Sequence, residues 1–134
     1  MANDRGAERF RAGVEAGDVE TALGALAENV VLHSPVTFKP FEGRAAVAHV
    51  LRTVFEVFED FRYTDQLEDR DAAALIFNAR VGDRKLDGLD LLRFDGDGKV
   101  RELSVMVRPM SGLNALAEAM GREFERLGIT PPGV

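Results

Sequence analysis

Hydrophobic residues in the first half of the chain recur at helical spacing. Such stripes run over residues 7–14 and 19–26, and Gly17-Asp18 between them supplies a helix stop followed by a new N-cap. The run Val30-Val31-Leu32-His33 then predicts the start of a strand, which Pro35 stops. Residues 47–58 carry the clearest helical stripe of the chain, so we expect this third helix to pack against a sheet.

In the second half the pattern changes to short apolar runs broken by turn signals, which predicts four consecutive strands joined as an antiparallel meander. A last amphipathic helix follows from about residue 111 to 127, where Gly128 ends it. Helices followed by antiparallel strands indicate an α+β fold, a single domain over residues 1–134 with its helices on one side of a curved sheet. The expected strands are 61–69, 72–81, 84–94 and 99–108.

One carboxylate, Asp90, lies among leucines in the third of these strands. If Gly82-Asp83 forms a two-residue hairpin turn, Leu75 lies opposite Asp90 on the preceding strand. A second two-residue turn at Gly96-Asp97 places Leu103 opposite it on the following strand. Cross-strand partners share a face, so Asp90 is predicted to project into an apolar concavity, where burial raises its pKa. A carboxylic acid kept neutral in this way can donate a hydrogen bond.

The alternative is a slip of one residue in either turn. Asp90 would then lie on the opposite face of the sheet, where it could pair with Arg80 or Arg101. The two interpretations differ in sign, because burial raises the pKa of a carboxyl group and an ion pair lowers it.

Composition restricts the partners of the chain. Its 134 residues carry a formal net charge of -6, which argues against nucleic acid or an anionic membrane surface, since phosphate contacts need clustered Lys and Arg. With no cysteine, and two histidines sixteen residues apart without a carboxylate at ligand spacing, we expect no metal site and no cofactor. The sequence has no apolar run of membrane-spanning length and its first ten residues lack the apolar core of a signal peptide, which predicts a cytoplasmic location.

Three segments of the sequence are informative in their order and spacing: "AGDVETALGALAENVVLHSP" at 16–35, "FEGRAAVAHVL" at 41–51 and "LDGLDLLRFDGDGKVREL" at 86–103. Taken together they resemble the nuclear transport factor 2-like superfamily, in its SnoaL-like polyketide cyclase and ketosteroid isomerase branch. The resemblance implies a cone, in which a strongly bent antiparallel sheet wraps around three N-terminal helices. It also implies a deep apolar cavity inside the cone, and often a homodimer.

The resemblance carries over only partly to individual residues. Ketosteroid isomerase-like sequences place an Asp base just before the Pro of the first strand, where this chain has Ser34. They also carry a Tyr eight residues before the helix-capping Asp, where this chain has Phe10. The second oxyanion group of those enzymes, an acid kept protonated by its apolar site, is matched by Asp90. These replacements argue against steroid isomerisation.

His33, Ser34 and Tyr63 are the other candidates for acid–base chemistry. Neighbours on a strand point to opposite faces, so only one of His33 and Ser34 can face inward, and the resemblance favours Ser34. His33 could act as a base near neutral pH if the strand end is distorted, or could bond under a loop or at an interface. Tyr63 shares strand parity with Phe61 and Leu67, so its hydroxyl points either into the cavity or to the rim of the core.

Two functions fit these observations. The first is a pocket for a small apolar or ring-containing metabolite, with proton-transfer chemistry of an isomerase, cyclase or hydrolase type that uses Asp90 as a neutral acid. The alternative is a non-catalytic ligand-binding or dimerising scaffold of the same fold. An outer strand face with Ser104, Met106 and Arg108 is assigned to a homodimer interface. The expected pocket-lining residues are Phe10, Val14, Leu32, Phe38, Val54, Phe58, Leu75, Phe77, Leu92, Leu103, Val105 and Val107.

Overall fold

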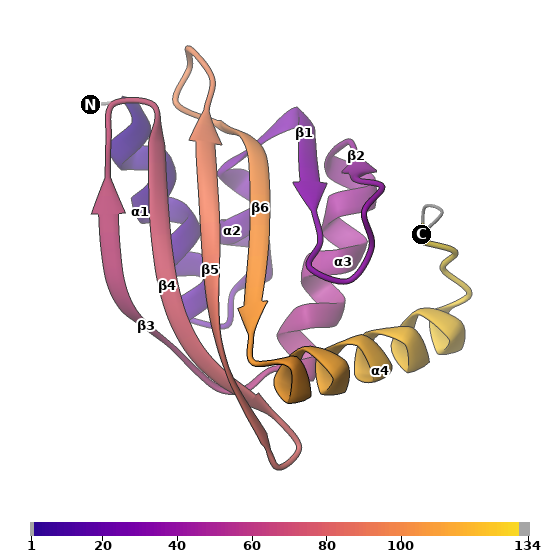
Figure 1. Ribbon diagram of the computed structural model, residues 1–134. Helices are drawn as coiled ribbons and strands as arrows, with labels where there is room; N and C mark the ends of the chain where they lie inside the picture. Colours follow the sequence, from indigo (N-terminus) through magenta and orange to yellow (C-terminus); the bar gives the residue numbers. More distant parts are fainter. Residues whose placement is uncertain (1, 132–134) are drawn as a thin grey trace.

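Four helices surround the concave side and one end of a six-stranded sheet in the computed structural model (Figure 1), which describes residues 2–131, with side chains from Gly6 onward. The helices are α1 (Ala2–Glu15), α2 (Val19–Gly24), α3 (Arg44–Val57) and α4 (Met110–Leu127). The strands are β1 (Leu26–His33), β2 (Phe41–Glu42), β3 (Glu59–Glu68), β4 (Ala72–Val81), β5 (Arg84–Phe94) and β6 (Val100–Arg108). This is the predicted α+β architecture, with a strongly bent sheet, three N-terminal helices and a C-terminal helix.

The helix ends follow from local chemistry. Asp18 caps α2, because its carboxylate accepts from the backbone nitrogen of Thr21 at 3.3 Å and from the Thr21 hydroxyl at 2.6 Å. At the other end of the chain α4 stops at Gly128, which adopts a left-handed conformation with φ of 70°. Both ends lie where the sequence predicts them.

The strand order is β2-β1-β6-β5-β4-β3, and the meander from β3 to β6 is antiparallel as predicted. The expectation of an antiparallel sheet throughout is wrong in one place, since β1 runs parallel to β6. The first strand also begins at Leu26, inside the stretch predicted as the second helix. There Leu26 pairs with Val100, and the Val100 nitrogen donates to the carbonyl of Ala25 at 2.9 Å, so pairing with β6 draws the chain into the sheet.

The register between β4 and β5 is the predicted one, with Leu75 opposite Asp90 and Phe77 opposite Gly88. Between β5 and β6 the prediction is wrong by two residues, because Asp90 faces Val105 and not Leu103. An offset of two residues keeps Asp90, Leu103 and Val105 on their predicted face. Asp90 therefore points to the concave side.

The core lies between this concave face and the helices. The stripe of α3 packs on β1, β2 and α4, and Val47 at the start of the stripe is completely buried. The opposite, convex face of β4, β5 and β6 carries no helix in Figure 1. No helix in the described part of the chain is long and apolar enough to cross a membrane.

Candidate functional site

A cavity of about 160 Å³ opens between the concave face of the sheet and helices α1, α3 and α4. Its wall is built almost entirely from aliphatic and aromatic side chains. Asp90 and Tyr63 are the ionisable groups among the described lining residues, and Ser34 and Thr37 add two hydroxyls. Pockets of this composition, apolar with a few convergent polar groups, are typical of small-molecule sites.

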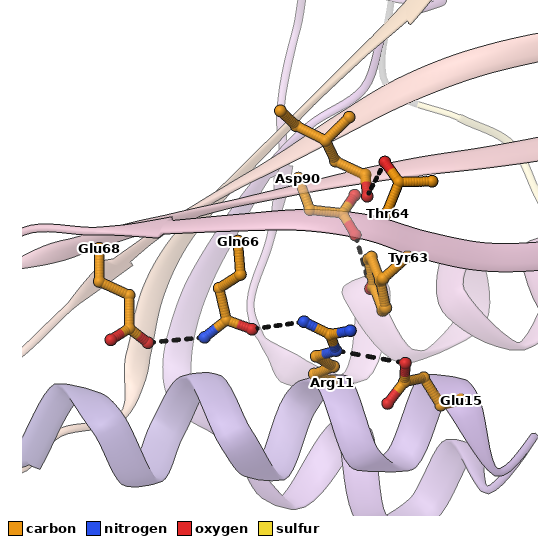
Figure 2. A network of polar contacts seen from close by, with 8 residues as sticks. Arg11, Glu15, Tyr63, Thr64, Gln66, Glu68 and Asp90 are labelled. Atoms are coloured by element: carbon orange, nitrogen blue, oxygen red, sulfur yellow. Dashed lines mark hydrogen bonds and ion pairs between the residues drawn. The ribbon is translucent and has the colours of Figure 1, made fainter.

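Asp90 and Tyr63 form a buried hydrogen-bonded pair. Asp90 is 8% exposed and Tyr63 is 7% exposed. The Tyr63 hydroxyl donates to Oδ2 of Asp90 at 2.9 Å, and Figure 2 shows the two side chains pointing toward each other from neighbouring parts of the sheet. Asp90 comes from the middle of β5 and Tyr63 from the edge strand β3. The intervening strand β4 separates the two strands, so a long tyrosine side chain is needed to span the gap.

Burial decides the ionisation of this pair. Loss of hydration raises the pKa of Asp90 from 3.8 to about 7, while the hydrogen bond from Tyr63 acts in the opposite direction. Burial, followed by the negative charge of Asp90, raises the pKa of the Tyr63 hydroxyl well above its usual value. Near neutral pH, Asp90 thus exchanges between its acid and carboxylate forms beside a phenol that keeps its proton.

A polar network holds Tyr63 from the outside (Figure 2). The Arg11 guanidinium lies 5.4 Å from the centre of the Tyr63 ring, a cation–π distance. Arg11 of α1 also donates to Gln66 of β3 at 2.8 Å and pairs with Glu15 at 3.2 Å. These contacts join α1 to the edge strand. Arg11 therefore covers one side of the Tyr63 ring, and the ring forms part of the cavity wall.

Three phenylalanines form an aromatic wall next to the pair. Phe61 stacks on Phe77 with ring centres 4.7 Å apart, and Phe58 lies 5.6 Å from Phe77 and 5.9 Å from Phe61. Tyr63 meets Phe61 edge to face at 4.9 Å. Aromatic rings on the cavity wall favour flat, apolar ligands in the adjoining part of the cavity.

Most of the residues expected on the cavity wall lie there. They are Phe10, Val14, Leu32, Ser34, Val54, Phe58, Tyr63, Phe77, Asp90, Leu103 and Val105.

Four of the expected lining residues lie elsewhere. Phe38 is 93% exposed in the loop after β1, so its side chain points to solvent. Leu75, opposite Asp90 on β4, and Leu92, two residues after it on β5, are completely buried and fill the core. Val107 lies farther along β6, outside the cavity wall. Sharing a face of the sheet with Asp90 was therefore insufficient to place a residue at the cavity, because the helices cover part of that face.

His33 and Ser34 divide between the two faces of the sheet. His33 is on the convex side, where its Nε2 lies 2.9 Å from Oε2 of Glu102. Ser34 lines the cavity, and its hydroxyl accepts from the backbone nitrogen of Val36 at 3.0 Å. This bond fixes Ser34 in the turn that follows β1. Across the part of the chain that the structure describes, no group of three or more His, Cys, Asp or Glu side chains is close enough to hold a metal ion.

Tyr63 reaches the cavity on the predicted strand parity, but Leu67 does not share its face. The pairing of β3 with β4 shifts between Tyr63 and Asp65, and Leu67 beyond that shift is exposed. A β-bulge of this kind reverses the faces of the residues that follow it.

The sequence pattern did not predict the part of the cavity wall that comes from α4 and from Pro131 beyond it. The stripe of α4 is recognisably apolar, but its pattern does not say whether it covers the sheet or a cavity. The lining residues from this segment are Leu116, Ala117, Met120, Gly121, Phe124 and Pro131.

Comparisons with known proteins agree with this geometry. Residues 7–103 match the family described as the SnoaL-like domain. A steroid delta-isomerase from Pseudomonas aeruginosa superposes with a TM-score of 0.90 at 40% identity, over 95% of this chain and 94% of that one. A protein with a cystatin-like fold from Silicibacter pomeroyi reaches a TM-score of 0.85 at 32% identity, over 90% and 85% of the two chains.

A de novo designed protein with a curved β-sheet also superposes with a TM-score of 0.73, over 91% of this chain and 96% of that one, at 14% identity. That likeness concerns the fold alone. No curated protein matches the chain significantly. On the match over residues 7–103 and the 40% identity to a solved relative, this chain belongs to the SnoaL-like domain family of the nuclear transport factor 2-like superfamily.

Proposed function

We propose that the protein binds a small, uncharged, oxygen-bearing apolar molecule in this cavity, and that Asp90 in its acid form donates a hydrogen bond or a proton to the oxygen. The observation that carries the proposal is the buried Asp90–Tyr63 pair on an otherwise apolar wall. A group with a pKa of about 7 can both donate and accept a proton near neutral pH, which suits general acid–base chemistry.

The roles of the two groups follow from their hydrogen bond. Tyr63 keeps its proton and donates to one carboxyl oxygen of Asp90. When Asp90 gives its proton to a ligand carbonyl, negative charge develops on the carboxyl group, and the Tyr63 hydroxyl stabilises that charge. Enolisation of a ketone is the simplest such reaction, in which the oxygen gains the Asp90 proton and the α-carbon loses one to water.

The 40% identical relative is named a steroid delta-isomerase, which supports proton-transfer chemistry in a cavity of this shape. Its named reaction is not carried over to this chain. By resemblance to ketosteroid isomerases, the base and the principal oxyanion donor would stand at Ser34 and Phe10. A neutral serine hydroxyl is far too weakly basic to replace the carboxylate base, and a phenylalanine ring has no hydrogen-bond donor, so neither residue takes these roles.

Hydrogen–deuterium exchange of a ketone tests the proposal. The probe is 1-tetralone, with two fused rings and one carbonyl oxygen, incubated with the protein in D2O near pH 7. We expect the protein to accelerate loss of the α-hydrogen NMR signal, Asp90→Asn to bind the ketone without that acceleration, and Asp90→Leu to bind it more weakly. Thr64→Val, at an exposed position of β3, is the matched control and should behave as the wild type.

A non-catalytic ligand-binding protein is the second candidate. It is favoured by the absence of a second carboxylate or imidazole among the described residues that line the cavity. Binding of 1-tetralone that depends on Asp90, without any accelerated exchange, would select this function over the enzymatic one.

We also propose that the protein forms a homodimer through the convex face of its sheet. This face carries a row of apolar residues, Ile76, Leu89 and Met106, which are aligned across β4, β5 and β6. Met106 is 55% exposed at the end of that row. Burying the row against the same row of a second copy would remove it from water.

A further inference from the structure

The size of the cavity, together with the position of its polar pair, restricts the ligand more closely than the family does. A cavity of about 150 Å³ lined by Leu, Ile and Phe binds a single benzene ring, whereas pockets for drug-sized molecules enclose about 300–1,000 Å³. The cavity of this protein, about 160 Å³, falls at the small end of this scale.

The exposure of the lining residues also shows at which side the cavity opens. Lining residues that are exposed, Val36, Gly121 and Pro131, come from the loop after β1, from α4 and from the segment beyond it. The mouth therefore lies between this loop and α4. Asp90 and Tyr63 are nearly fully buried, so a ligand reaches them only with the group that it inserts first.

The interior is closed around that group. Phe58, Phe61 and Phe77 are in mutual contact, with ring centres no more than 5.9 Å apart, and they occupy the space next to Tyr63. Phe77 is held in turn by Gly88 on β5, where even a methyl group would lie 2.0 Å from the ring. A ligand that inserts more deeply would have to displace this packed aromatic cluster, because close-packed side chains leave no free volume behind it.

The charge of the wall excludes a further class of ligands. Asp90 is the acidic group, and no Lys, Arg or His is found among the described residues that line the cavity. An anionic ligand would enter an apolar space without a cation to compensate for its desolvation, next to a group that ionises near neutral pH.

We infer that the ligand is an uncharged molecule of one or two rings with a single oxygen at its leading end, and that four-ring molecules such as steroids are excluded by size. This inference rests on the proposed function, that the cavity binds a ligand through Asp90, and adds the size and polarity of that ligand. It separates this chain from a relative whose name refers to a steroid.

Binding of three probes to the purified protein tests the inference. The probes are 1-tetralone, tetralin, which has the same two rings without oxygen, and 4-androstene-3,17-dione, a four-ring ketone. Dissociation constants are measured by NMR titration at pH 6, below the pKa of Asp90. We expect 1-tetralone to bind at least about tenfold more tightly than tetralin, since one good hydrogen bond contributes about that factor, and more than about tenfold more tightly than the steroid.

A variant with a wider cavity tests whether the aromatic cluster sets the size limit of the ligand. Phe58→Leu replaces one ring of the aromatic cluster with a smaller side chain, and we expect it to reduce the preference for 1-tetralone over the steroid by about tenfold. Val54→Ala, at another point of the wall, is the second variant if Phe58→Leu does not fold, as judged by circular dichroism.

The outcomes separate this inference from the proposed function. Steroid binding to the wild type as tight as that of 1-tetralone, and weakened by Asp90→Leu, would overturn the size limit and leave the proposed function standing. Widened variants with unchanged discrimination would also overturn it, because the aromatic cluster would then not set the limit. If none of the three probes binds, the proposed function fails and the inference fails with it.

Discussion

Phe77 lies over the place that a side chain at Gly88 would occupy. The two residues face each other across β4 and β5, and a Cβ on Gly88 would lie 2.0 Å from Cζ of the Phe77 ring. The glycine thus lets a large ring lie flat over the sheet, two residues before Asp90 on the same face. The shape of the cavity wall beside Asp90 depends on this contact.

Gly88→Ala is therefore expected to destabilise the protein. The added methyl group forces the Phe77 ring to move, and overpacking of this kind costs about 1–3 kcal/mol. Urea unfolding monitored by circular dichroism measures the loss. Gly96→Ala is the matched control, because a methyl group at that position would have no atom within 4 Å and its turn is exposed. Equal stability of the two variants would show that the ring has room to move.

Replacing Asp90 with Asn is expected to change stability in a way that depends on pH. The pKa of Asp90 is about 7 in the folded protein, above its unfolded value of about 3.9, so the folded state holds a proton that the unfolded chain releases. The contribution of this group is fully present below about pH 4 and is lost as the pH rises toward 7. Relative to the wild type, Asp90→Asn should gain about 1.4 kcal/mol per pH unit across this window.

The measurement is the difference in unfolding free energy between wild type and Asp90→Asn at several pH values from 4 to 8. Taking the difference removes the other carboxyl groups, including Asp18, whose pKa is lowered by its bonds to Thr21. A difference that stays constant, or that falls with rising pH, would contradict a raised pKa for Asp90.

The register between β4 and β5 could be predicted because a two-residue turn at Gly82-Asp83 places Val81 opposite Arg84 and so fixes every later pair of the two strands. The register between β5 and β6 was predicted wrongly because a two-residue turn was also assumed at Gly96-Asp97. The Asp95 side chain accepts from the backbone nitrogens of Asp97 and Lys99, at 2.9 and 3.0 Å, and this loop is longer than two residues. The predicted register was wrong by two residues, and an even offset leaves Asp90 on its predicted face of the sheet.

Other parts of the site could not be read from local patterns. The bond between Tyr63 and Asp90 crosses the intervening strand β4 and depends on side-chain length, which periodicity does not describe. Leu67 left its expected face because of a bulge, and bulges leave no clear signal in a single sequence. The parallel pairing of β1 with β6 joins segments about 70 residues apart, for which no turn provides a register.

Tyr63→Phe is expected to raise the pKa of Asp90 above about 7. The Tyr63 hydroxyl donates to the carboxyl group and favours its ionised form, so loss of the hydroxyl leaves burial unopposed. The side-chain carbon of Asp90, titrated by NMR, reports the change directly. Thr64→Val is the control, since Thr64 is exposed and bonds to Asp65. A pKa that falls in Tyr63→Phe would mean that the hydroxyl does not stabilise the carboxylate.

The convex face provides the test of the proposed homodimer. Its apolar row of Ile76, Leu89 and Met106 runs across the strands, and on one side of it along β5 and β6 Asp87 pairs with Arg108 at 2.8 Å. On the other side, beyond Leu91 and Ser104, lies a second charged group, in which Glu102 is 2.9 Å from His33 and 3.5 Å from Arg93. An apolar centre with a polar rim is the usual anatomy of a protein interface.

Met106→Asp places a charge within the apolar row, and we expect it to convert a dimer to a monomer, because an unpaired carboxylate would be buried between the two copies. Sedimentation at micromolar concentration should give twice the chain mass of 14.7 kDa for the wild type and a single chain mass for the variant. Leu127→Asp is the matched control, since Leu127 is 49% exposed at the far end of α4, outside the sheet, and should leave the dimer intact. A wild type that sediments as a single chain would rule out the dimer, and a dimer that survives Met106→Asp would place its interface on another face of the cone.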